Sequence, residues 1–351
     1  MNLDDVAGFQ KLDSQNMIAQ INGLPDQLSY AYSLGKDFTL PPKKEYRHIL
    51  ISGMGGSAIG ADLVAAYVQD KISLPVVVHR DYELPLWVNE HTLVIASSHS
   101  GNTEETLWVF EQAHQRGCSI ISICTGGKLS TLARDFGMPL WQFEHRHAPR
   151  SAVGYSFGLL LALFERLGFI SSVQQEIEEA VHAMRNVQTS LGVDVPVTHN
   201  PAKRMAGQLF GRWVVVLAAD YLAPVARRWK GQINELAKAW AQFEFLPEAD
   251  HNTLAGLENP SAMLMNMMAL FIQAPGMNIR NQKRIELTRE MFMTQGINTD
   301  MIMARGDNKL AHIWTSILFG DYMAYYLAMA YGMDPTPIPI LDAFKMEMSS
   351  A

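Results

Sequence analysis

Hydroxyl-bearing side chains gather at two points of the sequence where a short apolar run gives way to a helix-like stretch. Residues 53–58 read Gly-Met-Gly-Gly-Ser-Ala, so that glycines open the backbone to a ligand and Ser57 offers a hydroxyl. Residues 98–106 read Ser-His-Ser-Gly-Asn-Thr-Glu-Glu-Thr, with four hydroxyls among nine residues. Neutral hydroxyls and the free N–H groups at the start of a helix can bind a phosphate monoester without any lysine. These segments, named here the first and second loops, therefore predict a phosphate site.

The phosphate contacts can be assigned to particular groups of the two loops. The hydroxyls expected to bind the phosphate are those of Ser57, Ser98, Ser100 and Thr103. The backbone of Gly55 and Gly56 is expected to approach the ligand closely, because neither residue carries a side chain.

Helix capping is a second interpretation of the second loop. Asn102 or Thr103 could cap the helix that follows, and the acidic residues after them would suit the positive end of its dipole. Capping is compatible with phosphate binding, but by itself it leaves Ser98 and Ser100 without a function upstream of the cap.

A dinucleotide site is a second interpretation of the first loop. Residues 53–58 match the pattern Gly-x-Gly-x-x-Ala between a strand and a helix, and Asp81 follows the next strand at about the distance of that fingerprint. A lone glycine fingerprint has many false positives, however, and a dinucleotide site gives no reason for the hydroxyls of the second loop. The phosphate interpretation is therefore favoured.

Strand-like and helix-like segments alternate along the chain from residue 47. Short apolar runs separated by helical stretches predict buried parallel strands in an α/β fold. In the first half we expect strands at 48–52, 74–79, 92–97 and 119–124, with helices at 57–69 and 104–115. Further on we expect helices at 156–167 and 174–191, then strands at 212–218 and 262–272 and helices at 230–241 and 282–295. The methionine-rich residues 263–268 are expected to pack in the core. The pattern predicts a doubly wound layout that occurs twice.

The composition excludes several classes of protein. The chain has 351 residues, of which 48% are hydrophobic, a formal net charge of −7 and a mean hydropathy near zero. These values indicate a soluble globular protein and argue against a nucleic-acid partner, which would need a basic face. Two cysteines, Cys118 and Cys124, are too few for a disulfide framework or a four-ligand zinc site. No apolar segment is long enough for a membrane span and residues 1–10 are polar, so we expect a cytoplasmic protein without membrane contact.

The two loops together resemble the sugar isomerase (SIS) domain, and the second loop is the more specific of the two signals. Later segments narrow the resemblance to the bifunctional phosphoglucose/phosphomannose isomerase family. These segments are Pro-Arg-Ser at 149–151, Lys-Gly-Gln-Ile-Asn-Glu-Leu-Ala-Lys at 230–238, His-Asn at 251–252 and Asn-Lys-Leu-Ala at 308–311. The matches run from about residue 47 to the C-terminal end in the order that the family shows them.

The resemblance implies a fold with two SIS-type doubly wound parallel α/β/α subdomains joined by bridging helices. The expected division is an N-terminal helical segment 1–45, a first SIS subdomain 46–168, bridging helices 169–200, a second SIS subdomain 201–333 and a C-terminal tail 334–351. It also implies a homodimer. The apolar stretch 310–333 is compatible either with a subunit interface or with the core of the second subdomain.

The resemblance further implies reversible isomerisation of glucose 6-phosphate or mannose 6-phosphate to fructose 6-phosphate through an enediolate. By resemblance Glu235 is the base that moves the proton and Arg150 stabilises the enediolate. His251 and Lys309 would share the opening of the sugar ring, with His251 reaching the site from the partner subunit. Neither a cofactor nor a metal is implied, and the sugar phosphate is the expected small-molecule partner.

A non-catalytic sugar-phosphate sensor is the alternative from a different functional class. A sensor would need the phosphate-binding hydroxyls of the two loops. It would have no use for Arg150, Glu235, His251 and Lys309 together, and the sequence holds all four. The isomerase is therefore the preferred interpretation.

Overall fold

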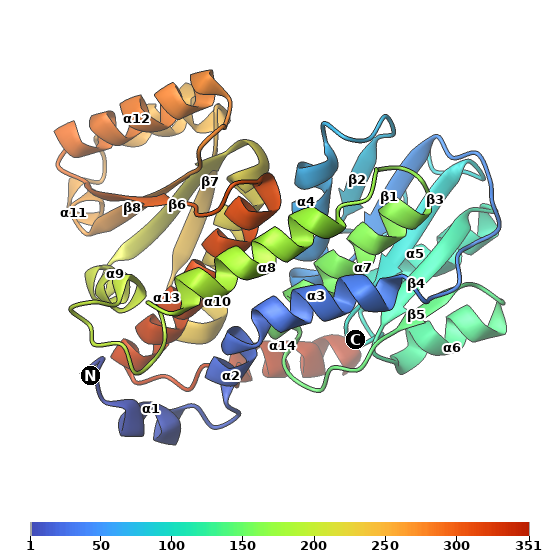
Figure 1. Cartoon of the computed structure of the whole chain (residues 1–351), viewed down its shortest axis with the longest axis horizontal. Coiled ribbons are helices and arrows are strands. Elements are labelled where there is room, and N and C mark those ends of the chain that lie inside the picture. Colours follow the sequence, from blue (N-terminus) through green and yellow to red (C-terminus); the bar gives the residue numbers. More distant parts are fainter. Residues whose placement is uncertain (1, 351) are drawn as a thin grey trace.

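Two all-parallel β-sheets, one from each half of the sequence, form the body of the protein in the computed structural model, which describes residues 2–350 (Figure 1). The first sheet has the strand order β2-β1-β3-β4-β5 and the second has the order β7-β6-β8-β9. The strands of the first sheet are β1 (His48–Ser52), β2 (Val76–His79), β3 (Thr92–Ser97), β4 (Ser119–Cys124) and β5 (Leu140–Gln142). Those of the second are β6 (Trp213–Ala219), β7 (Ala241–Leu246), β8 (Met267–Gln273) and β9 (Asn298–Met303). The predicted α/β fold class is confirmed.

Helices cover the sheets, because parallel neighbours must be joined by crossovers. In and before the first half they are α1 (Val6–Leu12), α2 (Met17–Asn22), α3 (Leu24–Gly35), α4 (Gly55–Val68), α5 (Glu104–Gln115), α6 (Gly127–Asp135) and α7 (Val153–Arg166). The remainder are α8 (Gln174–Gln188), α9 (Pro201–Leu209), α10 (Ala223–Ala237), α11 (Ser261–Leu264), α12 (Ile279–Thr294), α13 (Lys309–Tyr331) and α14 (Pro339–Ser350). Short 3₁₀ turns are η1 (Pro149–Ser151), η2 (Asp220–Leu222), η3 (Glu248–His251) and η4 (Thr253–Gly256). None of the described helices combines the length and apolarity that a membrane crossing requires.

The pleat of β1 divides the first sheet between two hydrophobic clusters. Successive side chains of a strand point to opposite faces. Ile49 and Ile51 accordingly join the cluster that includes α3, α4 and α7, whereas Leu50 joins the cluster formed with α5 and α6. Both faces of β1 are buried, which explains why the strand is apolar along its length.

The predicted strands 92–97 and 119–124 and the predicted helix 104–115 coincide with β3, β4 and α5. The predicted helix 230–241 is wrong at both ends, because α10 begins at Ala223 and ends at Ala237. Lys238 adopts a left-handed conformation with φ 52° that ends the helix, and the following Ala-Gln-Phe-Glu-Phe-Leu forms β7. The alternation of apolar and polar residues in that segment is the strand signal that the prediction passed over.

The methionine-rich segment does not pack as predicted. Residues 261–264 form the short helix α11, and the strand begins only at Met267. Met263 is 51% exposed and Met265 is 73% exposed, whereas Met267 and Met268 are buried in β8. The prediction failed because apolar composition alone does not separate a surface turn from the strand that follows it.

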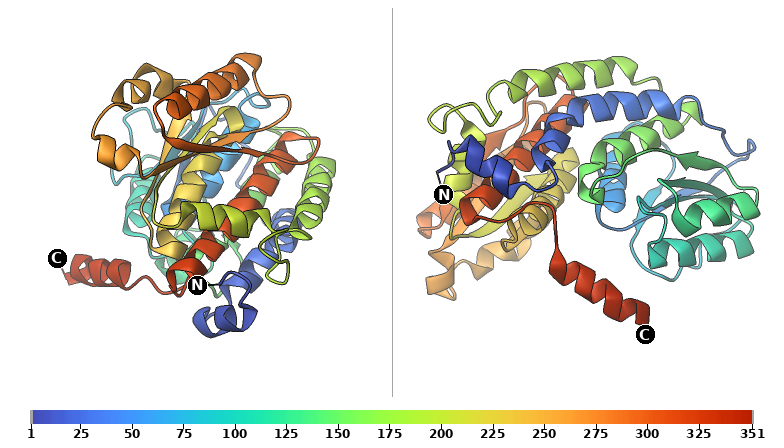
Figure 2. Two further views of the ribbon diagram at one scale, coloured as in Figure 1. Left: turned by 90° about the vertical axis from the view of Figure 1, so that its left-hand side faces the viewer. Right: turned by 90° about the horizontal axis from the view of Figure 1, so that it is seen from below.

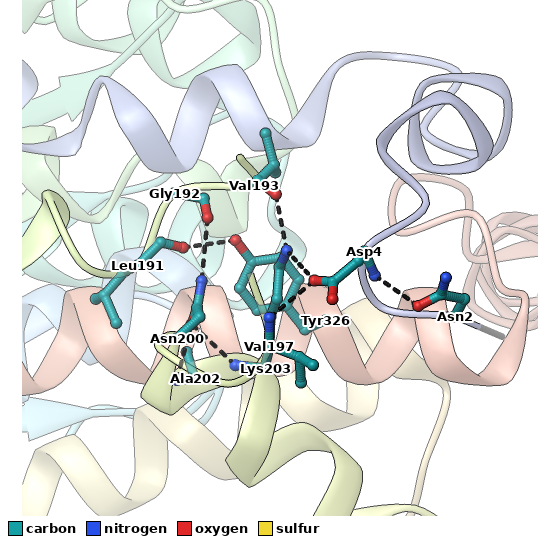
Figure 3. A network of polar contacts seen from close by, with 10 residues as sticks. All are labelled: Asn2, Asp4, Leu191, Gly192, Val193, Val197, Asn200, Ala202, Lys203 and Tyr326. Carbon is teal, nitrogen blue, oxygen red and sulfur yellow. Dashed lines mark hydrogen bonds and ion pairs between the residues drawn. The ribbon is translucent and has the colours of Figure 1, made fainter. Parts of the chain in front are cut away.

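The two ends of the chain have different environments. At the C-terminal end α14 projects away from the body of the molecule in both further views (Figure 2). Its large side chains Ile340, Phe344 and Met346 are more than 60% exposed. At the N-terminal end the polar network of Figure 3 attaches the first residues to α9 and α13.

Lys203 lies at the centre of that network. Its side chain is 1% exposed, and its ammonium lies 3.2 Å from an Asp4 carboxylate oxygen and donates to the Val193 carbonyl at 2.7 Å (Figure 3). The same Asp4 oxygen accepts the backbone N–H of Val197, and the lysine lies over the ring of Tyr326. A buried ammonium is tolerated only with such partners.

We predict that Lys203→Met lowers the free energy of unfolding by about 1–3 kcal/mol, because the partly buried Val193 carbonyl loses its donor. Urea unfolding followed by circular dichroism measures this change. The control is Lys11→Met at an exposed position of α1, which should change the stability by less than about 0.5 kcal/mol. Equal stabilities of the two variants would contradict the structural role of Lys203.

Candidate active site

The first and second loops meet at the carboxyl edge of the first sheet. They follow β1 and β3, which are direct neighbours. The backbone N–H of His99 donates to Ser57 Oγ at 3.1 Å, which joins the two loops. Within the second loop Ser98 Oγ lies 2.8 Å from Thr103 Oγ1 and accepts the N–H of Gly101 at 3.1 Å. The four hydroxyls predicted to bind phosphate therefore come from two adjacent loops, and that of Ser100 is on the exposed side.

Neither helix that starts at these loops is capped by a side chain. Thr103 occupies the N-cap position of α5 but makes no capping hydrogen bond, since its hydroxyl is paired with Ser98. Asn102 does not cap α5 either, because its side-chain oxygen accepts the N–H of Lys128 instead. Met54, the N-cap of α4, has no polar side chain to cap with. The capping interpretation is wrong, and no described side chain caps the start of either helix, although the Ser57 N–H of α4 donates to the Met54 carbonyl at 3.0 Å.

Glycines bring these loops close to two other turns. A Cβ atom at Gly56 would lie 2.7 Å from the Pro149 carbonyl oxygen, so only glycine lets α4 contact η1 this closely. A Cβ atom at Gly101, where φ is +68°, would lie 1.7 Å from the Gly126 carbonyl oxygen. The first contact matters most for chemistry, because η1 carries Arg150.

Arg150 and Glu235 form an ion pair beside the loops. Arg150 Nη1 lies 3.6 Å from Glu235 Oε2, and the side chains are 6% and 34% exposed. Arg150 Nη2 donates to the carbonyl of Pro335 at 2.8 Å and to that of Thr336. The buried Nε of Arg150 has no partner among the described residues. Burial lowers the pKa of the guanidinium and the Glu235 carboxylate raises it; an arginine remains charged in either case.

Lys238 adds a second cation that sequence reasoning did not single out. Its Nζ donates to the carbonyls of Leu236 at 3.2 Å and Asp334 at 2.5 Å. Burial lowers the pKa of this ammonium to about 8, and the neighbouring Arg150 acts in the same direction. The contact with Asp334 joins positions 96 residues apart, so no local sequence pattern predicts it.

A histidine pair flanks the second loop. His99 Nε2 lies 2.8 Å from His145 Nδ1, and Phe143 packs against both His99 and Tyr155. Burial lowers the pKa of each imidazole to about 4, so both rings are neutral near pH 7. The pair therefore links the second loop to the segment that leads into η1. Among residues 2–350 there is no group of three or more His, Cys, Asp or Glu side chains that could hold a metal ion.

The structure does not bring His251 to Glu235 within one chain. Glu235 lies in the last turn of α10, which ends before β7, and His251 follows the far end of β7 in η3. The six residues of β7 separate these two ends by about 20 Å. His251 is exposed.

The structure does not bring Lys309 to Glu235 either. Lys309 is the first residue of α13, and Asp334, beside Lys238, follows the last. The 23 residues of α13 separate its ends by about 34 Å. Lys309 Nζ instead lies 2.5 Å from an Asp70 carboxylate oxygen, and its hydrogen bond lowers the pKa of that carboxyl. The lysine was assigned by its place before a long helix, and the contacts of Glu235 are at the other end of that helix.

Comparisons with known proteins agree with this arrangement. Residues 44–167 match the family model "SIS domain", and residues 198–348 match "Bacterial phospho-glucose isomerase C-terminal SIS domain". The chain is 38% identical over 337 residues to the bifunctional phosphoglucose/phosphomannose isomerase of Caldicellulosiruptor bescii, covering 95% of this chain and 99% of the relative. It is 30% identical to the Aquifex aeolicus protein of the same name, covering 93% and 97%. Neither matching family model describes a dinucleotide-binding domain.

Solved structures share the fold at low identity. The C-terminal domain of glucosamine-fructose-6-phosphate aminotransferase from Francisella tularensis superposes with a TM-score of 0.72 at 14% identity, covering 92% of this chain and 98% of that one. Tagatose-6-phosphate ketose/aldose isomerase from Escherichia coli gives a TM-score of 0.68 at 16% identity, covering 90% and 93%. These likenesses establish the arrangement of two SIS-type sheets.

We predict that Thr103→Val weakens the binding of inorganic phosphate about fivefold, equivalent to about 1 kcal/mol, because a hydroxyl at the uncapped start of α5 is lost. Isothermal titration calorimetry measures the affinity. Thr92→Val, at the opposite end of β3, is the matched control and should leave the affinity unchanged. Equal affinities of the Thr103 variant and the unmodified protein would place the phosphate elsewhere.

Proposed function

The chain belongs to the bifunctional phosphoglucose/phosphomannose isomerase family, and from this premise we propose that it interconverts glucose 6-phosphate or mannose 6-phosphate with fructose 6-phosphate. The observation that carries the proposal is the pairing of a buried arginine with a partly exposed carboxylate beside two uncapped helices. Such a site brings a fixed positive charge, a base and an anion-binding surface into adjacent parts of the fold.

Glu235 is proposed as the base that moves the proton between the two carbons. Its carboxylate takes the proton from C2 of the open-chain aldose, the C2 electron pair forms the C1–C2 double bond, and the electrons of the C1 carbonyl move onto O1 to give the enediolate. A proton passes from O2 to O1, the C2 carbonyl forms, and the Glu235 carboxylic acid returns its proton to C1, which gives the ketose. The exposed third of the Glu235 side chain leaves it accessible to substrate, while the ion pair with Arg150 fixes its orientation.

Arg150 is proposed to stabilise the enediolate oxygens. A guanidinium that cannot deprotonate keeps its charge throughout the reaction, and burial strengthens its interaction with a developing negative charge. Its unpartnered Nε supplies a donor that the protein itself does not use. The phosphate is proposed to bind at the start of α5, with Ser57, Ser98, Ser100 and Thr103 as donors and the backbone of Gly55 and Gly56 close by.

The sensor alternative is disfavoured by the same geometry. A binding protein would not require a buried guanidinium in contact with a carboxylate, because burying a charge costs free energy without adding affinity for a neutral sugar ring. The relatives with the highest coverage are also named as isomerases. The pair is therefore assigned to catalysis.

We predict that Glu235→Gln abolishes isomerisation of both sugar phosphates while binding remains within about threefold, because the amide keeps the shape and removes the base. A coupled assay for fructose 6-phosphate and calorimetry with a substrate analogue measure the two quantities. Glu248→Gln, an exposed acidic residue of η3, is the control. Turnover by the Glu235 variant within tenfold of the unmodified enzyme would refute the assigned base.

The active enzyme is proposed to be a homodimer in which each site receives His251 from the partner subunit. The distance imposed by β7 supports this arrangement, since His251 of the same chain lies at the wrong end of that strand. The apolar character of α13 is not evidence for a subunit interface, because Ile313, Trp314 and Ile317 are fully buried within one chain. His251 is proposed to act as the acid and base in ring opening.

We predict that mixing Glu235→Gln with His251→Ala subunits restores about a quarter of the activity, because half of the dimers are mixed and each has one intact site of two. Activity is assayed after subunit exchange in mild denaturant. Mixing Glu235→Gln with Arg150→Ala is the control and should restore nothing, because one chain supplies both residues to a site. Background activity in the first mixture would show that His251 is not shared.

A cytoplasmic location is proposed on the basis of the two thiols. Cys118 and Cys124 are both buried and unpaired, and burial raises the pKa of each thiol to about 11. Unpaired cysteines of this kind are typical of proteins in a reducing compartment.

A further inference from the structure

Three successive backbone carbonyls after α13 accept hydrogen bonds from two cations, the buried Arg150 and the exposed Lys238. The carbonyl of Asp334 accepts from Lys238 Nζ, and those of Pro335 and Thr336 accept from Arg150 Nη2. The turn is closed on itself, because the Thr336 N–H donates to the Asp334 carboxylate at 2.9 Å. This segment, named here the 334–336 turn, is therefore attached from one side by η1 and from the other by the end of α10.

The backbone conformation of Lys238 directs its side chain toward this turn. The residue ends α10 in the left-handed conformation with φ 52°, and its N–H donates to the Ile233 carbonyl. The side chain folds back over the helix end, so its ammonium bonds both the Leu236 carbonyl and the Asp334 carbonyl. Glu235 lies three residues before Lys238, and its carboxylate raises the pKa of the ammonium.

We propose that Lys238 is a positioning residue for the isomerase reaction: its ammonium holds the 334–336 turn, and through that turn it keeps Arg150 beside Glu235. The inference rests on the proposed function, which assigns the chemistry to Arg150 and Glu235. If the ammonium is deprotonated, the neutral amine is a weaker donor to the Asp334 carbonyl, and the turn that accepts both Arg150 hydrogen bonds is held less firmly on one side. The guanidinium then no longer has a fixed place relative to the carboxylate.

The charged groups around Lys238 make its contact with the 334–336 turn sensitive to alkaline pH. The charged groups that face it are Arg150 on η1, Glu235 on α10 and Asp334 after α13. Burial and Arg150 favour the neutral amine, the two carboxylates oppose them, and the resulting pKa of Lys238 is about 8. Arg150 itself stays protonated over this range. Activity is therefore expected to fall as the pH rises through about 8.

Stability is expected to change in the opposite direction. The pKa of Lys238 is about 8 in the folded chain and 10.5 in the reference state. Between these values the unfolded chain binds a proton that the folded chain has released, so folding becomes more favourable as the pH rises. If Lys238 only stabilised the fold, its deprotonation would lower activity and stability together. We expect instead that deprotonation lowers the activity while folding becomes more favourable.

The test compares Lys238→Arg, which keeps a permanent charge, with Lys238→Asn, which removes the charge and still tolerates the left-handed backbone. The substrate phosphate is fully ionised above about pH 7 and does not interfere. For the unmodified enzyme kcat should be about tenfold lower near pH 9 than near pH 7. Lys238→Arg should lack this fall and keep kcat near pH 7 within about threefold. Lys238→Asn should lower kcat at least about tenfold at both pH values, with KM within about threefold.

Lys283→Arg and Lys283→Asn at an exposed position of α12 are the matched controls and should follow the unmodified enzyme. An unchanged alkaline fall in Lys238→Arg, or full kcat in Lys238→Asn, would overturn the proposal while leaving the isomerase function intact. Urea unfolding of the unmodified protein and Lys238→Asn near pH 7 and near pH 9.5 needs no substrate. The unmodified protein should gain stability over the variant as the pH rises, and a constant difference would overturn the placement of Lys238 even if neither sugar phosphate were converted.

Discussion

Burial of the Arg150 guanidinium constrains everything around it. A charge that is 6% exposed is tolerated only where hydrogen bonds and an opposite charge replace its hydration. Two segments that are remote in sequence supply these partners: α10 through Glu235, and the 334–336 turn through two carbonyls. The η1 turn itself is pressed against α4 at Gly56. The site is therefore a consequence of packing between the two halves of the chain.

The two sheets contribute to the site in different ways. The first sheet presents the carboxyl ends of β1 and β3, where parallel strands offer free N–H groups and hydroxyls. The second half contributes the C-terminal ends of two of its helices, namely the last turn of α10 and the segment after α13. The carboxyl edge of its sheet carries His251 and Lys309, far from Glu235. In the proposed function the repeated fold is thus used asymmetrically, with one half binding the phosphate and the other supplying the base.

Local patterns and the resemblance predicted different parts of this structure. Apolar runs located β3 and β4 and the intervening helix, because those strands are buried on both faces. The edge strand β9 was missed, since Asn-Thr-Asp-Met-Ile-Met is half polar and packs on one sheet neighbour only. Arg150 and Glu235 were named through the resemblance, and the structure brings them together. Lys238 depends on a turn 96 residues away, and Lys309 lies at the other end of α13 from the contacts of Glu235 in the same chain.

In the proposed reaction, the neutral donors of the first and second loops hold the phosphate and the fixed charge of Arg150 acts at the reacting carbons. A protein with net charge −7 needs no basic surface to hold a phosphate when two uncapped helix starts and several hydroxyls converge. The phosphate carries the same charge in substrate and product, so strong attraction there would bind both equally and add nothing to turnover. Charge develops only on the enediolate. Placing the buried cation at that point concentrates the electrostatic stabilisation on the transition state.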